Sequence, residues 1–95
     1  MVTRAAAPPP AIVAPLTGTR IALDPDIPVS RQRVMFEARH VSDEARWVLD
    51  GMEIGEGATF LWAPAPSRHT LGLVDRAGRV RDTSAFEVRG AVSRD

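Results

Sequence analysis

Apolar and polar residues alternate with a period of two in several short windows of the chain, which is the period of a half-buried β-strand. In residues 31–39, for example, Val34, Phe36 and Ala38 fall on one side, and mainly charged residues fall on the other. No window shows a convincing 3.6-residue period, and eight prolines and seven glycines interrupt the chain. The pattern therefore predicts a β-rich chain without a long helix.

Seven strands are predicted from these windows: residues 20–24, 31–39, 44–50, 52–55, 58–63, 68–75 and 79–89. Asp50-Gly51 has the composition of a two-residue type I′ turn, which would join two of them as a hairpin. Asp82 and Ser84 lie on the apolar side of the last window, so we expect a bulge or crossover near residues 82–85. Short strands at this near-regular spacing predict an all-β fold, an immunoglobulin-like antiparallel β-sandwich.

The beginning of the chain differs from the rest in composition. Residues 1–10 are rich in Ala and Pro, which is typical of a semi-rigid spacer between domains. Three consecutive prolines interrupt its apolar stretch, and no hydrophobic region of a signal peptide follows. We therefore expect a linker remnant over residues 1–10, one domain over residues 11–90 and a tail over residues 91–95. A chain of 95 residues is long enough for one small domain.

The composition excludes several classes of chemistry. The chain has no Cys, which rules out disulfides, zinc ribbons and thiol nucleophiles, and no Lys, which rules out Schiff bases and the phosphate-binding P-loop. Twelve basic residues balance twelve acidic ones, so no net field attracts nucleic acid or anionic lipid. Arg76, Arg79 and Arg81 cluster at a predicted hairpin, where a basic patch to grip carboxylates is the alternative to a solvated face. Interspersed acidic residues favour the solvated face for this cluster. For the whole chain we expect no cofactor.

One possible catalytic set lies along the strand predicted over residues 68–75. His69 could act as a general base, and Ser67 and Asp75 would complete a triad on paper. All three lie on or beside one strand at even offsets, so they cannot converge on one reacting atom. We therefore predict a structural His69, hydrogen-bonded beneath a loop, and no catalytic residue.

Two groups of carboxylates also suggest metal binding. His40 with Asp43 and Glu44 could form a loop site, but no second His lies near in the sequence, so a plain surface loop is favoured. Asp24 and Asp26 flank a proline, where paired carboxylates can serve acid–base chemistry or bind Ca²⁺. That segment is more simply a turn that leaves the first strand. No metal site is predicted.

The apolar residues suggest where the domain binds a partner. Trp47 and Trp62 could stack on a sugar, but a buried Trp on the third strand is usual in this fold class, so Trp47 is assigned to the core. The side of the sheet to which Trp62 points is ambiguous because Leu61 competes for the inward side. Met35 and Val48 are apolar on otherwise charged faces, and they would form a small exposed patch if their strands are neighbours. Trp62, Met35 and Val48 are therefore the candidate binding residues.

Several motifs occur in a specific order along residues 12–88. They are Ile12-x-x-Pro15-x-x-Gly18-x-x-Ile21-x-Leu23-Asp24, then Pro28 and Gln32, Trp47-Val48-Leu49-Asp50-Gly51, Trp62-x-Pro64, His69-x-Leu71-x-Leu73-Val74-Asp75-x-x-Gly78 and Phe86-x-Val88. This ordered set resembles the C-terminal domain family of the bacterial penicillin-binding proteins of the 1C type, which are bifunctional peptidoglycan synthases anchored in the inner membrane.

The resemblance implies an immunoglobulin-like module that follows the transpeptidase domain and faces the periplasm. Catalysis would lie outside these residues, and the absence of Lys agrees, since acyl-enzyme chemistry of this kind needs Ser-x-x-Lys and Lys-Thr-Gly. We expect a non-catalytic module whose contacts position the parent enzyme, with a periplasmic protein, the parent transpeptidase domain or peptidoglycan as partner. The alternative is a glycan-binding β-sandwich module of a secreted or periplasmic enzyme.

Overall fold

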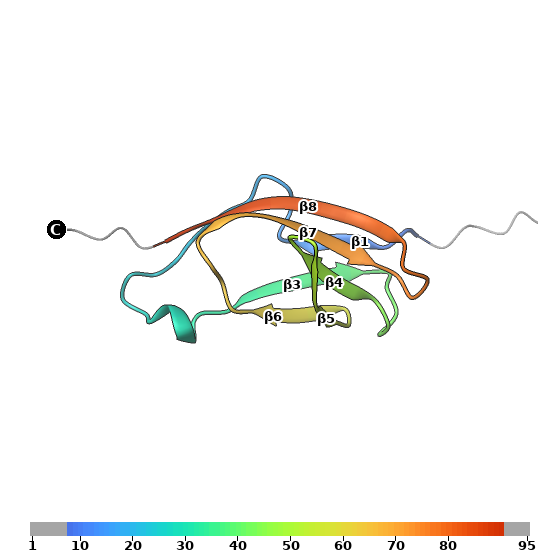
Figure 1. The fold of residues 1–95 in the computed structure, drawn as a ribbon, viewed down its shortest axis with the longest axis horizontal. Coiled ribbons are helices and arrows are strands. Elements are labelled where there is room, and N and C mark those ends of the chain that lie inside the picture. Colours follow the sequence, from blue (N-terminus) through green and yellow to red (C-terminus); the bar gives the residue numbers. More distant parts are fainter. Residues whose placement is uncertain (1–7, 91–95) are drawn as a thin grey trace, which may run out of the picture.

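The fold, seen in a computed structural model that describes residues 8–90, consists of two layers of β-strands (Figure 1). The elements are β1 (Ala11–Ala14), β2 (Arg20–Ala22), the 3-10 turn η1 (Val29–Arg31), β3 (Val34–Arg39), β4 (Arg46–Leu49), β5 (Met52–Glu56), β6 (Thr59–Trp62), β7 (Ser67–Val74) and β8 (Val80–Arg89). The predicted all-β sandwich is confirmed, with eight strands in this part of the chain instead of seven. Residues 1–7 of the expected linker and the expected tail, residues 91–95, lie outside the described residues.

One sheet has three strands in the order β1-β3-β6, and the other has five in the order β2-β8-β7-β4-β5. All pairs are antiparallel except β2 with β8, which is parallel. The strand that sequence analysis missed is β1, because its four residues show no alternation and lie between prolines. Between β1 and β2 the chain passes from the three-stranded sheet to the five-stranded sheet, and we call residues 15–19 the crossing segment. Because of this crossing, β2 runs parallel to β8.

Polar side chains of β8 hold the crossing segment in place. Asp82 accepts a 2.8 Å hydrogen bond at Oδ2 from the N–H of Ile12, and the Ser84 hydroxyl donates to the carbonyl of Pro15. Further along, the N–H of Gly18 donates to the carbonyl of Ala85 over 2.8 Å. A buried polar group needs such a partner, so the inward positions of Asp82 and Ser84 are explained by their bonds to β1 and to Pro15 at the start of the crossing segment.

The bulge expected near residues 82–85 occurs slightly earlier in β8. Leu73 pairs with Asp82 but Val74 pairs with Val80, so Arg81 is the extra residue. Past this bulge the alternation changes sides, and Val80 is 61% exposed. The Asp50-Gly51 turn agrees with prediction, since both residues have positive φ, at 51° and 85°.

Aromatic side chains fill the space between the sheets. Phe36 of β3 is fully buried, and its ring centroid lies 5.7 Å from Trp47, 6.3 Å from Phe60, 5.3 Å from Trp62 and 5.9 Å from Phe86. These partners come from β4, β6 and β8 and so belong to both sheets. Aromatic pairs at 4.5–7 Å contribute about 0.5–1.5 kcal/mol each beyond area burial.

The ring of Phe60 also covers the backbone of β5. A Cβ atom added at Gly55 would lie 2.3 Å from Cε1 of that ring, which is closer than van der Waals contact allows. By contrast, a Cβ added at Gly72 of β7 would meet its nearest atoms, in Val48, at 3.7 Å, an ordinary contact distance. Only the first of these glycines is required by packing.

We predict that Gly55→Ala lowers the free energy of unfolding by about 1–3 kcal/mol, because the added methyl overpacks the core against Phe60. Gly72→Ala is the matched control and should change the free energy by less than about 1 kcal/mol. Urea denaturation of both variants measures the difference. Equal stability of the two variants would contradict the placement of Phe60 over β5.

Candidate functional site

Trp62 lies in the core at the end of β6 and is 8% exposed. Its ring stacks on Phe36 with an interplanar angle of 26°, and meets His69 and Phe86 edge-on at centroid distances of 4.9 and 5.8 Å. This placement corrects the expectation that Trp62 is available to a ligand, because rings from both sheets cover it. The assignment of Trp47 to the core is confirmed, and its indole N–H donates to the carbonyl of Gly57 over 3.0 Å.

The patch predicted from Met35 and Val48 does not form, because their strands belong to different sheets. Met35 lies on β3 of the three-stranded sheet, whereas Val48 lies on β4 of the five-stranded sheet, where it is half-buried opposite Gly72. The alternation of apolar and polar residues correctly predicted that Met35 and Val48 point away from the core. It could not tell which strands are neighbours, since that depends on pairing between segments far apart in the sequence.

Met35 instead pairs with Leu61 of β6, directly across the strands. The two residues are 50% and 57% exposed on the outer face of the three-stranded sheet, and Val13 of β1 is exposed on the same sheet. We call the pair of Met35 and Leu61 the outer apolar patch, whereas Val13 lies at the bulge of β1, beside Glu37 and Ala38. Glu37 and Arg39, which follow Met35 on β3, are exposed beside it. Sequence analysis missed Leu61, and its only signal was the competition of Leu61 with Trp62 for the inward side of the strand.

His69 of β7 is buried and held at both ring nitrogens. Nδ1 lies 2.6 Å from Oδ2 of Asp50, and Nε2 lies 2.7 Å from the carbonyl oxygen of Ala65 in the loop before β7. Oδ1 of Asp50 accepts a 2.8 Å hydrogen bond from the N–H of Thr70. The prediction of a structural His69 bonded beneath a loop is confirmed. Its carboxylate partner is Asp50 of the hairpin turn, which the alternation could not reveal.

The hydrogen bond to His69 lowers the pKa of Asp50 below its ordinary value, and the backbone N–H of Thr70 adds to this effect. Both interactions stabilise the carboxylate form. The buried ring thus ties the β4–β5 turn to the loop that enters β7. Ser67 and Asp75 lie apart from it, since the Ser67 hydroxyl bonds the carbonyl of Arg68 and Asp75 begins the β7–β8 turn.

The loop after β2 is held by one amide side chain. Gln32 donates through Nε2 to the carbonyls of Asp24 and Ile27, at 3.0 and 2.9 Å, and its Oε1 accepts from the N–H of Asp24. Oδ1 of Asp24 accepts a 2.8 Å bond from the N–H of Asp26, which forms a turn. These bonds agree with the prediction of a turn at Asp24 and Asp26.

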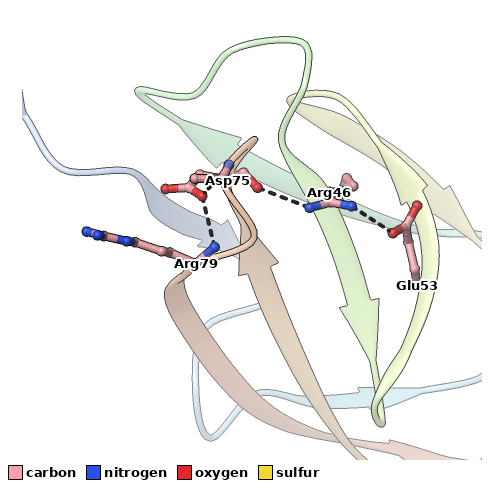
Figure 2. Close-up of polar contacts among 5 residues, drawn as sticks. Arg46, Glu53, Asp75 and Arg79 are labelled. Atoms are coloured by element: carbon pink, nitrogen blue, oxygen red, sulfur yellow. Dashed lines mark hydrogen bonds and ion pairs between the residues drawn. The ribbon is translucent and has the colours of Figure 1, made fainter.

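A cleft of about 610 Å³ lies at one end of the sandwich, between the β3–β4 loop and the β7–β8 turn. Leu73 and Val74 form part of its floor, and an ion pair between Glu44 and Arg76 (3.5 Å) lies among its lining residues. Figure 2 shows Arg46 near this end, where it reaches Glu53 at 3.4 Å and the carbonyl of Asp75 at 3.3 Å. The charged groups here are engaged with one another.

Asp75 organises the turn between β7 and β8. The hydrogen bond from the N–H of Arg79 is the largest cause of the lowered pKa of the Asp75 carboxyl. The N–H of Ala77 and the guanidinium of Arg81 lower the pKa further. Arg81 pairs with Asp75 at 3.4 Å, whereas the side chain of Arg79 extends away from the turn (Figure 2). Since Arg76 and Arg81 each pair with a carboxylate, this cluster agrees with the expected solvated face of mixed charge.

His40 begins the exposed β3–β4 loop with a positive φ of 59°, and Asp43 and Glu44 are exposed on the same loop. Over residues 8–90, no group of three or more His, Asp or Glu side chains is placed to hold a metal ion. Within the same residues, no helix is long and apolar enough to cross a membrane.

These features define a small β-sandwich module with an exposed apolar pair, Met35 and Leu61, on the outer face of the three-stranded sheet. Residues 2–86 match the penicillin-binding protein C-terminus family, and the chain belongs to that family. The match begins inside the segment predicted as a linker. Comparison with curated proteins gives no match.

Among solved structures, the chain is similar to fibronectin(III)-like modules of Clostridium thermocellum CbhA. The similarity has a TM-score of 0.64 at 15% identity and covers 87% of this chain and 99% of that one. At this identity the likeness concerns the fold alone, and it agrees with the sandwich described above.

We predict that Asp50→Asn destabilises the domain at pH 7 and that the difference from the wild type shrinks below about pH 4. The folded pKa of Asp50 is lowered, so its contribution is present above the unfolded value of about 3.9 and is lost as pH falls through the folded value. Urea denaturation at pH 7, 5 and 3 measures the difference in the free energy of unfolding between the variant and the wild type. Asp43→Asn, in the exposed β3–β4 loop, is the control, and a pH-independent difference for Asp50→Asn would refute the assignment.

Proposed function

We propose that this domain is a non-catalytic periplasmic module of a peptidoglycan synthase of the penicillin-binding protein 1C type, and that it positions the parent enzyme through protein contacts. The partner is a periplasmic protein or the transpeptidase domain of the parent. Family membership supports the context of the module, and the outer apolar patch supports its mode of binding.

The observation that carries the proposal is the exposed pair of Met35 on the central strand and Leu61 on the edge strand of the three-stranded sheet. An apolar group bordered by charged residues, here Glu37 and Arg39, is typical of a surface that contacts protein. Met side chains adapt to irregular partner surfaces, which suits such a contact.

The character of the exposed apolar residues favours protein over glycan. Between residues 8 and 90, all of the large exposed ones are aliphatic: Val13, Leu16, Ile27, Val29, Met35, Met52, Leu61 and Val80. Both indoles lie in the core, so no Trp offers a flat face on which a sugar ring could stack. The glycan-binding alternative depended on such a face.

The hydrogen bonds of the buried His69 support a non-catalytic role for the domain. His69, the best candidate for a base, has oxygen atoms within 2.7 Å of both ring nitrogens and lies under a loop. A group held in this way is not free to take a proton from a substrate. Ser67 and Asp75, the other residues of the triad considered above, lie apart from His69.

A photo-crosslinking amino acid at position 35 of the full parent protein, expressed in its own cells, tests the proposal. We expect protein adducts, either with another periplasmic protein or with the transpeptidase domain, and few adducts from the same amino acid at Met52. Met52 is the matched control because it is an exposed Met on the other sheet. With the cross-linker moved to Leu61, Met35→Glu should lower adduct yield about tenfold by placing a charge in the contact.

Co-sedimentation of the domain with peptidoglycan sacculi provides the opposing measurement. We expect the domain to stay in the supernatant. Pelleting with sacculi, together with a lack of protein adducts at position 35, would overturn protein contact in favour of cell-wall binding.

A further inference from the structure

Two sheets leave four strand edges, and natural proteins protect such edges against pairing with other chains. The edge at β2 is only three residues long and carries Arg20, which lies 4.0 Å from Glu87. The edge at β5 carries two acidic residues, Glu53 and Glu56. Short length and charge are both recognised means of protecting an edge, so these two edges are accounted for.

The edge at β1 is protected in a different way, because β8 covers it. The N–H of Ile12 donates to Asp82, and the carbonyl of Pro15 accepts from Ser84, so side chains of the other sheet bind the polar groups of this edge. Covering by another element is equally effective against pairing.

The remaining edge, at β6, is also short, with four residues, but within the described residues it has neither a charged side chain nor a hydrogen bond from the other sheet. It lies at the end of the three-stranded sheet, and no charged residue occurs between Glu56 and Arg68. Ala38 N–H donates to the carbonyl of Ala58, so hydrogen-bonded and non-hydrogen-bonded positions alternate along β6 from that point. By this alternation, the N–H and C=O groups of Thr59 and Leu61 point toward the open edge.

We infer that this edge pairs with β6 of a second copy of the chain, antiparallel and about a two-fold axis, to form a continuous six-stranded sheet. An isologous contact needs a self-complementary surface. An edge without charge meets this condition, because no residue faces its own like charge across the axis. The contact concerns the domain with itself and goes beyond the positioning of the parent enzyme.

The register that lets the outward-pointing groups of Thr59 and Leu61 bond to each other places the axis at Phe60. Thr59 of each copy then lies opposite Leu61 of the other, and the two Leu61 side chains occupy diagonal positions about 7–8 Å apart. The two apolar pairs of Met35 and Leu61 would become one patch across the axis. The strand has four residues, so the buried area falls below that of a stable dimer and the association is weak.

Sedimentation equilibrium of the 95-residue chain, from about 10 μM to 1 mM, tests the inference over the range expected for a small interface. The weight-average mass should rise from that of a monomer toward that of a dimer. Leu61→Glu and Leu61→Arg should each weaken association about tenfold, since two like charges then lie at diagonal positions across the axis. Met52→Glu, on a different strand, should leave it unchanged. Thermal melting checks that each variant is folded.

An equimolar mixture of the Leu61→Glu and Leu61→Arg proteins gives the most specific result. We expect association to return in the mixture, because opposite charges now lie near each other across the axis. A wild type that stays monomeric at 1 mM, association insensitive to charge at position 61, or a mixture that remains monomeric would each overturn the inference.

Discussion

The rest of the structure depends on the contact of Phe36 with aromatic rings from both sheets. Its partners, Trp47, Phe60, Trp62 and Phe86, come from three strands of the two layers, and together they form the centre of the interface between the sheets. The domain is small and has no disulfide, so apolar burial is its main source of stability. With only five aromatic residues in the chain, all five are used in this cluster.

This use of the aromatic residues decides what remains for the surface. Within the described residues the large exposed apolar side chains are aliphatic, and two of them, Met35 and Leu61, pair on the outer face of the three-stranded sheet. The polar residues that looked suited to chemistry are bound to the scaffold instead, as in the pair of His69 and Asp50. The surface therefore offers the outer face of the three-stranded sheet, with Met35 and Leu61, and the edge strand β6. This arrangement is consistent with a module that acts through contacts with other proteins.

Alternation predicted the side of the sheet on which most residues lie, because each strand buries one face against the same core. It identified Phe36, Ala38 and Trp47 as inward and Met35 as outward, and the type I′ turn followed from Asp50-Gly51. The family resemblance, carried by ordered motifs, was confirmed by the match over residues 2–86.

Features that depend on contacts between distant segments were not predictable in this way. The neighbour of Met35 is Leu61 rather than Val48, and nothing in either strand alone contains that information. The same holds for the bonds from β8 to the crossing segment, which explain Ser84 on an inward position. The strand β1 was missed because four residues between prolines show no period, and only its pairing with β3 makes it a strand.

The central claim is that both indoles belong to the core and leave surface contacts to aliphatic residues. Acrylamide quenching of tryptophan fluorescence tests it directly on the native chain. The account predicts weak quenching of the native protein and strong quenching after denaturation in guanidinium, since Trp47 and Trp62 are almost fully buried. Quenching of one indole in the native protein as strong as in the denatured chain would contradict it and would restore an exposed Trp as a ligand platform.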